Sequence, residues 1–107
     1  MHSDLVYEAR AEILKAMAHP SRLKMLDALE KGERCVCELQ ELVGSDLSTV
    51  SRHLSVMKAA GLVAAHKRGS NVYYKLRVPC VLRMFGCVEA VLAADEKDRA
   101  RLARELA

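Results

Sequence analysis

The chain lacks the features that would place it in a membrane or outside the cell. Its 107 residues contain no apolar run of about eighteen residues, the length that a transmembrane helix needs. No positively charged segment followed by an apolar one opens the chain, so no secretory signal is expected. We therefore expect a cytoplasmic protein, whose four cysteines act as reduced thiols, ligands or redox sensors rather than as structural disulfides.

Catalytic motifs are missing as well. The sequence has no paired carboxylates on one face and no glycine loop that could cradle a phosphate. Nothing resembles a serine–histidine–aspartate arrangement beyond Ser51 and His53, on an expected outward face. There are also no repeats, low-complexity segments or long linkers. These absences argue against an enzyme and predict a single domain, residues 1–107, long enough to bury a core.

Residues 36–60 have the pattern of two short helices joined by a tight turn. A first apolar stripe ends at Gly44, and Asp46 is placed to cap the next helix with its carboxylate. The apolar residues of that next helix follow the three- and four-residue spacing of a buried face: Leu47, Val50, Leu54, Met57. Together they predict a helix-turn-helix.

The positions between those apolar residues should face outward. They carry short hydroxyls and two cations: Ser48, Thr49, Ser51, Arg52, Ser55, Lys58. Such a face suits the major groove of DNA, where Arg52 can reach guanine or a phosphate. We therefore predict DNA contacts from one set of residues on this helix: Ser48, Thr49, Ser51, Arg52, His53.

Residues 62–77 predict a two-stranded hairpin directly after that helix. Gly61 ends the helix, and turn residues 68–71 separate two runs rich in β-branched and aromatic residues. Lys67 and Arg68, at the tip, should contact the DNA backbone or minor groove. Although the net charge is only +3, no acidic residue lies between Asp46 and Glu89, so the positive charge is concentrated in this segment.

Helices are also predicted at both ends of the chain. Residues 4–17 and 79–94 each carry an apolar stripe broader than a small core needs, so both are expected to form a homodimer interface. A further scaffold helix should begin at Pro20 and end at Gly32. Residues 95–107 are charged and rich in alanine, which is typical of an exposed helix extension or of a frayed tail.

Five segments of the chain occur in a characteristic order: 19–23, 35–39, 48–54, 60–63, and 68–69 with 73–76. Together they resemble the ArsR/SmtB family of metal- and metalloid-responsive repressors. It implies a homodimeric winged helix-turn-helix, mainly α, with about five helices and a two-stranded wing. It also implies repression by binding an operator of imperfect inverted-repeat DNA, and release when an effector binds.

Cys35 and Cys37 are the predicted effector ligands. Two thiolates one residue apart can converge on one thiophilic ion if the backbone between them is not regular helix, and a helix start favours thiolates. The resemblance implies arsenite or antimonite at this position, most like the arsenite-responsive type. The alternative is that both cysteines are small buried hydrophobic residues.

The sequence departs from that type at the third ligand. Gln40 stands where a third cysteine would be expected, so Cys80 and Cys87 are the possible additional ligands. These two are seven residues apart, about 10.5 Å along a helix axis, and cannot both ligate one ion from one straight helix. Solvent or a small cellular thiol could also complete the site. The resemblance implies that zinc-sensing members use histidine on the last helix and cadmium-sensing members use cysteines before the first helix. This chain has neither, which disfavours both kinds of site.

Other effectors remain open. A thiol-redox or polysulfide signal would need two thiols that can meet, and a Cys35–Cys37 disulfide would close a strained short loop, so arsenite is favoured. Cadmium or lead would be other thiophilic effectors of the same fold. A winged helix that binds DNA without responding to any ligand is the third alternative.

Overall fold

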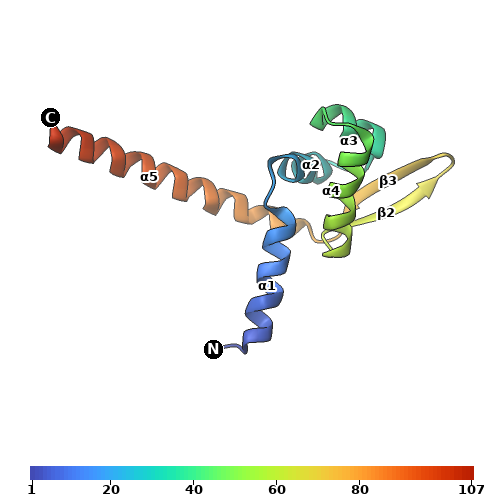
Figure 1. Ribbon diagram of the computed structural model, residues 1–107, viewed down its shortest axis with the longest axis horizontal. Helices are drawn as coiled ribbons and strands as arrows, with labels where there is room; N and C mark the ends of the chain where they lie inside the picture. The colour runs from blue at the N-terminus through green and yellow to red at the C-terminus, as the bar shows by residue number, and fades with distance from the viewer.

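The computed structural model describes all 107 residues and confirms the winged helix-turn-helix (Figure 1). The elements in chain order are α1 (Asp4–Met17), α2 (Pro20–Glu30), β1 (Arg34–Cys35), α3 (Val36–Val43), α4 (Leu47–Ala59), β2 (Val63–Arg68), β3 (Asn71–Leu76), the 3-10 helix η1 (Pro79–Arg83) and α5 (Met84–Leu106). Helices α3 and α4 form the predicted helix-turn-helix, and β2 with β3 forms the wing.

Local capping explains where the middle helices begin and end. Pro20 opens α2, where its fixed φ suits the first turn and its missing N–H costs nothing. Gly44 ends α3 in the left-handed region with φ 79°, which a residue with a side chain rarely adopts. The Asp46 carboxylate then accepts a hydrogen bond from the Thr49 backbone N at 2.9 Å and starts α4. The predicted roles of these three residues are confirmed.

The sheet has three antiparallel strands in the order β1-β3-β2, where the sequence predicted only two. The hairpin pairs Val63 with Leu76 and Arg68 with Asn71. Strand β1 adds to the other edge of β3, with Cys35 opposite Tyr73. A strand of two residues has no alternating pattern that a sequence can display, which is why β1 was not predicted.

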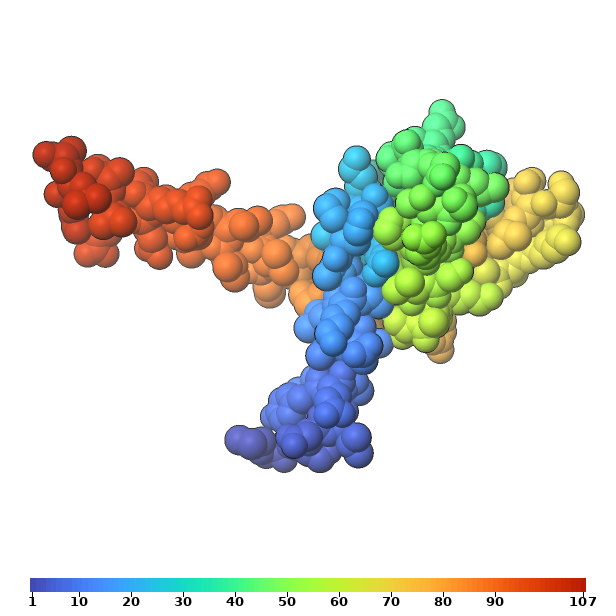
Figure 2. All heavy atoms as spheres, in the orientation of Figure 1, coloured from blue at the N-terminus to red at the C-terminus, as the bar shows by residue number.

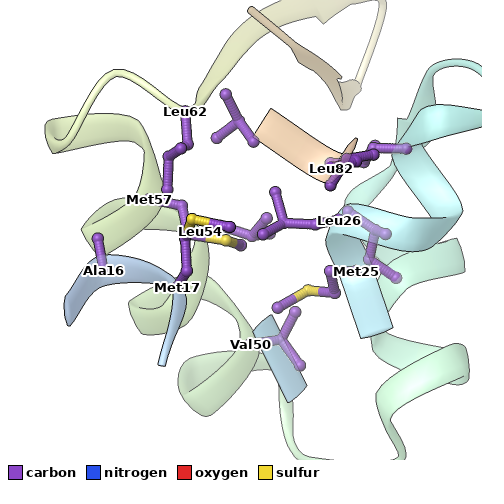
Figure 3. Close-up of a cluster of buried hydrophobic side chains, with 12 residues drawn as sticks. Ala16, Met17, Met25, Leu26, Val50, Leu54, Met57, Leu62 and Leu82 are labelled. Carbon is purple, nitrogen blue, oxygen red and sulfur yellow. The ribbon is translucent and has the colours of Figure 1, made fainter. Parts of the chain in front are cut away.

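One apolar core of twelve residues holds these elements together. Figure 3 shows side chains from the end of α1, from α2 and α4, and from η1 meeting in one cluster. Met25, Leu26 and Leu54 are completely buried in it. Leu47 is a correction: it was predicted to belong to the buried stripe, but it is 50% exposed, because as the first residue of α4 it lies beyond the edge of the core.

Helices α1 and α5 project from this body as two arms (Figure 2). Residues 95–106 continue α5, so this segment forms an extension of the last helix and not a frayed tail. No residue of α5 is buried, and Val91 and Leu92 are 68% and 61% exposed. Leu5 on α1 is 75% exposed. No helix in the chain combines the length and the apolar character that crossing a membrane requires.

Candidate nucleic-acid interface and thiol pair

The outward face of α4 carries most of the predicted DNA-contacting residues. Ser48, Ser51 and Arg52 are exposed, and Thr49 is half-buried. The Ser48 hydroxyl donates to the Asp46 carboxylate at 3.3 Å. Hydrogen bonds from Thr49, with a smaller effect of Arg52, hold the pKa of Asp46 below its usual value, so the cap stays charged and fixes the first turn of α4.

His53 does not belong to that face: the sequence predicted it to point outward, and it is buried. Its side chain is only 8% exposed, because position 53 turns toward the core side of α4. Arg22 Nε donates to His53 Nδ1 at 3.0 Å, and Arg22 also donates to the Ala16 carbonyl at 3.3 Å. The His19 and His53 rings lie 4.3 Å apart. His53 therefore anchors α4 to the start of α2.

The surroundings of His53 favour the neutral form of its ring. Burial lowers the pKa of His53 below 6.5, and the charges of His19, Arg22 and Arg52 lower it further. A neutral Nδ1 is also what the contact with Arg22 requires, because that nitrogen accepts the hydrogen bond.

The wing tip is basic, as predicted, but one of its cations is already paired. Lys67 and Arg68 are both exposed. Arg68 forms an ion pair with Glu33 at 2.8 Å, and His66 Nε2 lies 3.4 Å from the same carboxylate. The Arg68 guanidinium also lies 4.5 Å from the centre of the Tyr73 ring. Sequence reasoning missed Glu33, because only the pairing of β1 with β3 brings it beside the wing.

Cys35 and Cys37 meet at the start of α3. Cys35 is the N-cap residue with extended backbone (φ −74°, ψ 159°), and Cys37 lies in the first turn of the helix. Their Cα atoms are 5.4 Å apart, and the two sulfurs are joined in a disulfide. The two sulfurs converge, as expected, but only Cys35 is extended, because Val36 between them is already the first residue of α3. The expectation of two separate thiols, with a disulfide disfavoured by its short loop, differs from the structure.

Cys35 is connected to both halves of the DNA-binding unit. Its sulfur accepts a hydrogen bond from the Glu38 backbone N at 3.4 Å, and its own backbone N donates to the Glu38 carboxylate at 3.1 Å. These reciprocal bonds start α3. Cys35 also pairs with Tyr73 of the wing strand β3. Cys35 is buried and Cys37 is exposed. A reagent that reacts at Cys37 can therefore affect Cys35, which belongs to both the start of α3 and the sheet.

Cys80 and Cys87 are not brought to this pair. Both are exposed, Cys80 in η1 and Cys87 in α5. No group of three or more histidine, cysteine or acidic side chains in the chain is arranged to hold a metal ion. Within one chain, the pair therefore offers two sulfurs and no third ligand.

An exposed helix face with hydroxyls and arginine, followed by a basic hairpin, defines a winged helix-turn-helix DNA-binding protein. A family model described as "Bacterial regulatory protein, arsR family" matches residues 19–65. The chain is 34% identical over 107 residues to an uncharacterised HTH-type transcriptional regulator, Rv0081 of Mycobacterium tuberculosis, covering 99% of this chain and 94% of the relative. The chain belongs to the arsR family and is a transcriptional regulator.

Two solved structures and a further relative are also similar to this chain. The crystal structure of Rv0081 has a TM-score of 0.77 and covers 92% of this chain and 99% of its own. The homodimeric winged helix-turn-helix DNA-binding domain of Mb0332 from Mycobacterium bovis has a TM-score of 0.72 at 36% identity, with 90% of each chain covered. The transcriptional repressor SmtB of M. tuberculosis is 37% identical over 71 residues, 66% of this chain and 53% of that protein.

Proposed function

We propose that the protein is a cytoplasmic, homodimeric repressor that leaves its operator when arsenite or antimonite binds the thiolates of Cys35 and Cys37. The observation that carries the proposal is the position of this pair, with both sulfurs together at the N-cap of α3. The description of Mb0332 as a homodimeric DNA-binding domain and of SmtB as a repressor supports the other parts.

The chemistry of the pair suits a thiophilic metalloid. Thiolates prefer soft ions, and the positive end of the α3 dipole favours deprotonation of both cysteines once they are reduced. Sulfurs that can reach each other can also share one arsenic atom. Two thiols then displace two hydroxyls of arsenous acid as water, and the third hydroxyl stays or exchanges with a small thiol. Such a ligand set accounts for a site without a third cysteine nearby.

Binding would act on DNA through the start of α3. An arsenic atom bound to Cys35 and Cys37 would fix the position of the Cys35 sulfur, which accepts the hydrogen bond from the Glu38 backbone N, and so would change the geometry of the capping bonds. Because α3 packs on α4, and β1 pairs with the wing, a change there alters the angle of both DNA-contacting elements. A two-fold dimer needs its two α4 helices about 10 base pairs apart, so a small reorientation weakens binding to both half-sites.

Oxidation is the second candidate, favoured by one observation: Cys35 and Cys37 are already joined through their sulfurs. In this version, the two thiols lose two electrons and two protons to an oxidant such as a polysulfide, and an S–S bond forms. Both capping bonds are present with the sulfurs joined, so an S–S bond would act instead by tying the N-cap of α3 to its first turn. Cadmium and lead are less suited, because they favour more sulfurs than this chain gathers.

The test is a titration of the reduced protein on a fluorescent duplex from its own promoter. Arsenite, cadmium, zinc and a polysulfide are added in turn to the wild type, to a Cys35→Ser/Cys37→Ser variant and to a Cys80→Ser/Cys87→Ser control. We expect release by arsenite that only the first variant loses. Release by polysulfide alone would favour oxidation, and arsenite release retained in the first variant would contradict the proposal.

A further inference from the structure

Leu47 is a large apolar side chain left in solvent on the helix that faces DNA. It is 50% exposed, although its neighbours on the outward face, Ser48 and Ser51, are polar. A single exposed leucine is ordinary on a protein surface. The position of Leu47 suggests a function, because it is the first residue of α4 and lies one turn before Ser51 on the same helix surface.

The first turn of a recognition helix is the part that approaches base edges most closely. Here that turn is held in place by the cap, with Asp46 accepting hydrogen bonds from the Thr49 backbone N and from the Ser48 hydroxyl. Leu47 is therefore presented on a fixed element. Its side chain cannot donate or accept a hydrogen bond, so it can make a favourable contact only with an apolar group.

The major groove offers one prominent apolar group, the C5 methyl of thymine. The rival occupant, a second copy of the chain, fits less well. The apolar surfaces suited to a dimer lie on α1 and α5, and α1 meets α4 near Val56 and Ala59, more than two helical turns from Leu47. The first turn of α4 lies instead beside α3 (Figure 1).

We propose that Leu47 is a specificity-determining residue that contacts a thymine methyl group in each operator half-site. The inference rests on DNA binding through α4 but not on the identity of the effector. Covering one methyl group from water corresponds to about a four-fold change in affinity. Leu47 should therefore decide sequence preference at one base pair of each half-site and leave the phosphate contacts unchanged.

The experiment replaces each thymine of the promoter duplex in turn by deoxyuridine, which lacks only the methyl group. Affinities are measured by fluorescence anisotropy for the wild type, for Leu47→Ala and for Leu42→Ala. The last is a matched control, because Leu42 is 45% exposed but lies on α3. For the wild type, we expect deoxyuridine at one position per half-site to weaken binding about four-fold. Leu47→Ala should bind the thymine duplex about four-fold more weakly per half-site and be indifferent to deoxyuridine at that position.

Two results would overturn the inference: wild-type binding that no deoxyuridine weakens, or a Leu47→Ala variant that keeps the full sensitivity of the wild type. Circular dichroism and an unchanged salt dependence of binding show that the variant is folded and keeps its phosphate contacts. Failure of DNA binding itself would appear differently, as a wild type that does not bind the all-thymine duplex, and would refute the proposed function together with this inference.

Discussion

The contact between Arg22 and His53 joins two helices inside the protein. His53 lies on α4, yet it faces inward and accepts a hydrogen bond from Arg22 of α2. This hydrogen bond between the two helices requires an unprotonated Nδ1 on His53. Protonation of this buried ring would break the hydrogen bond and loosen the attachment of α4 to α2.

This contact predicts a loss of stability in mild acid. The pKa of His53 is lowered in the folded state, so the unfolded chain takes up the proton first as the pH falls. The contribution of neutral His53 to stability is complete above pH 6.5, and it is lost as the pH falls below 6.5 and through the lowered pKa of the folded state. We expect the Tm of the wild type to fall between about pH 7.5 and about pH 5, and more steeply than that of His53→Gln.

His66→Gln is the matched control for that measurement, since His66 is on the partly exposed wing. It should keep most of the pH dependence of the wild type. Equal slopes for the wild type and His53→Gln would show that His53 does not carry the effect.

Leu54 and Leu47 give a second prediction at the residue scale. Leu54 is completely buried and Leu47 is half exposed on the same helix. Leu54→Ala should lower the free energy of unfolding by about 2–5 kcal/mol, because it removes buried methyl groups and leaves a cavity. Leu47→Ala should change it by no more than about 0.5 kcal/mol. Urea denaturation of both variants decides whether α4 is oriented as described.

At the scale of elements, the short strand β1 has an effect larger than its two residues suggest. It brings Glu33 beside the wing, where the carboxylate pairs with Arg68 and lies next to His66. It also holds Cys35 against Tyr73. The thiol pair and the wing are therefore neighbours through one edge of the sheet.

The Glu33 ion pair predicts stronger DNA binding when it is removed. Glu33→Gln frees Arg68 for a phosphate and removes one negative charge from the DNA-facing side. One additional phosphate contact would steepen the slope of log affinity against log salt by about 0.9. Glu30→Gln, an exposed change of the same charge on α2, is the control. Weaker binding by Glu33→Gln would mean that the pair positions the wing for DNA instead of restraining Arg68.

At the scale of the whole molecule, the two projecting helices, α1 and α5, determine its extended shape. The chain extends 63 Å along its longest axis, and α5 contributes no buried residue to the core. Exposed apolar side chains on α1 and α5 include Leu5, Val91 and Leu92. Surfaces of this kind are covered in stable proteins, and a second copy related by a two-fold axis would cover both at once.

Disrupting this surface should separate the subunits. We expect Val91→Lys/Leu92→Lys to sediment as a monomer at concentrations where the wild type sediments as a dimer. Its affinity for a two-half-site duplex should fall by at least about ten-fold, because each subunit then binds alone. Lys97→Gln, on the side of α5 away from Val91 and Leu92, should behave like the wild type in both assays. A monomeric wild type would refute the dimer.

Much of this protein is determined by its local sequence. The spacing of Val50, Leu54 and Met57, together with the cap at Asp46, predicts α4 within a residue of its observed start. The turn residues near Gly69 predict the wing, and the segments shared with the ArsR/SmtB family predict the order of the elements. These features depend on neighbours a few residues away, so the sequence displays them directly.

Only the tertiary structure decided the exposure of Leu47, the pairing of Glu33 with Arg68 and the attachment of β1 to the wing. The inward position of His53 follows from its spacing, three residues after Val50 and four before Met57, which the sequence interpretation overlooked. Periodicity assigns a face to residues in the middle of a helix, but the surroundings of a helix end depend on what else packs there. Ion pairs such as Glu33 with Arg68 join residues 35 positions apart. Such contacts leave no local pattern, because their geometry exists only once the core has brought distant segments together.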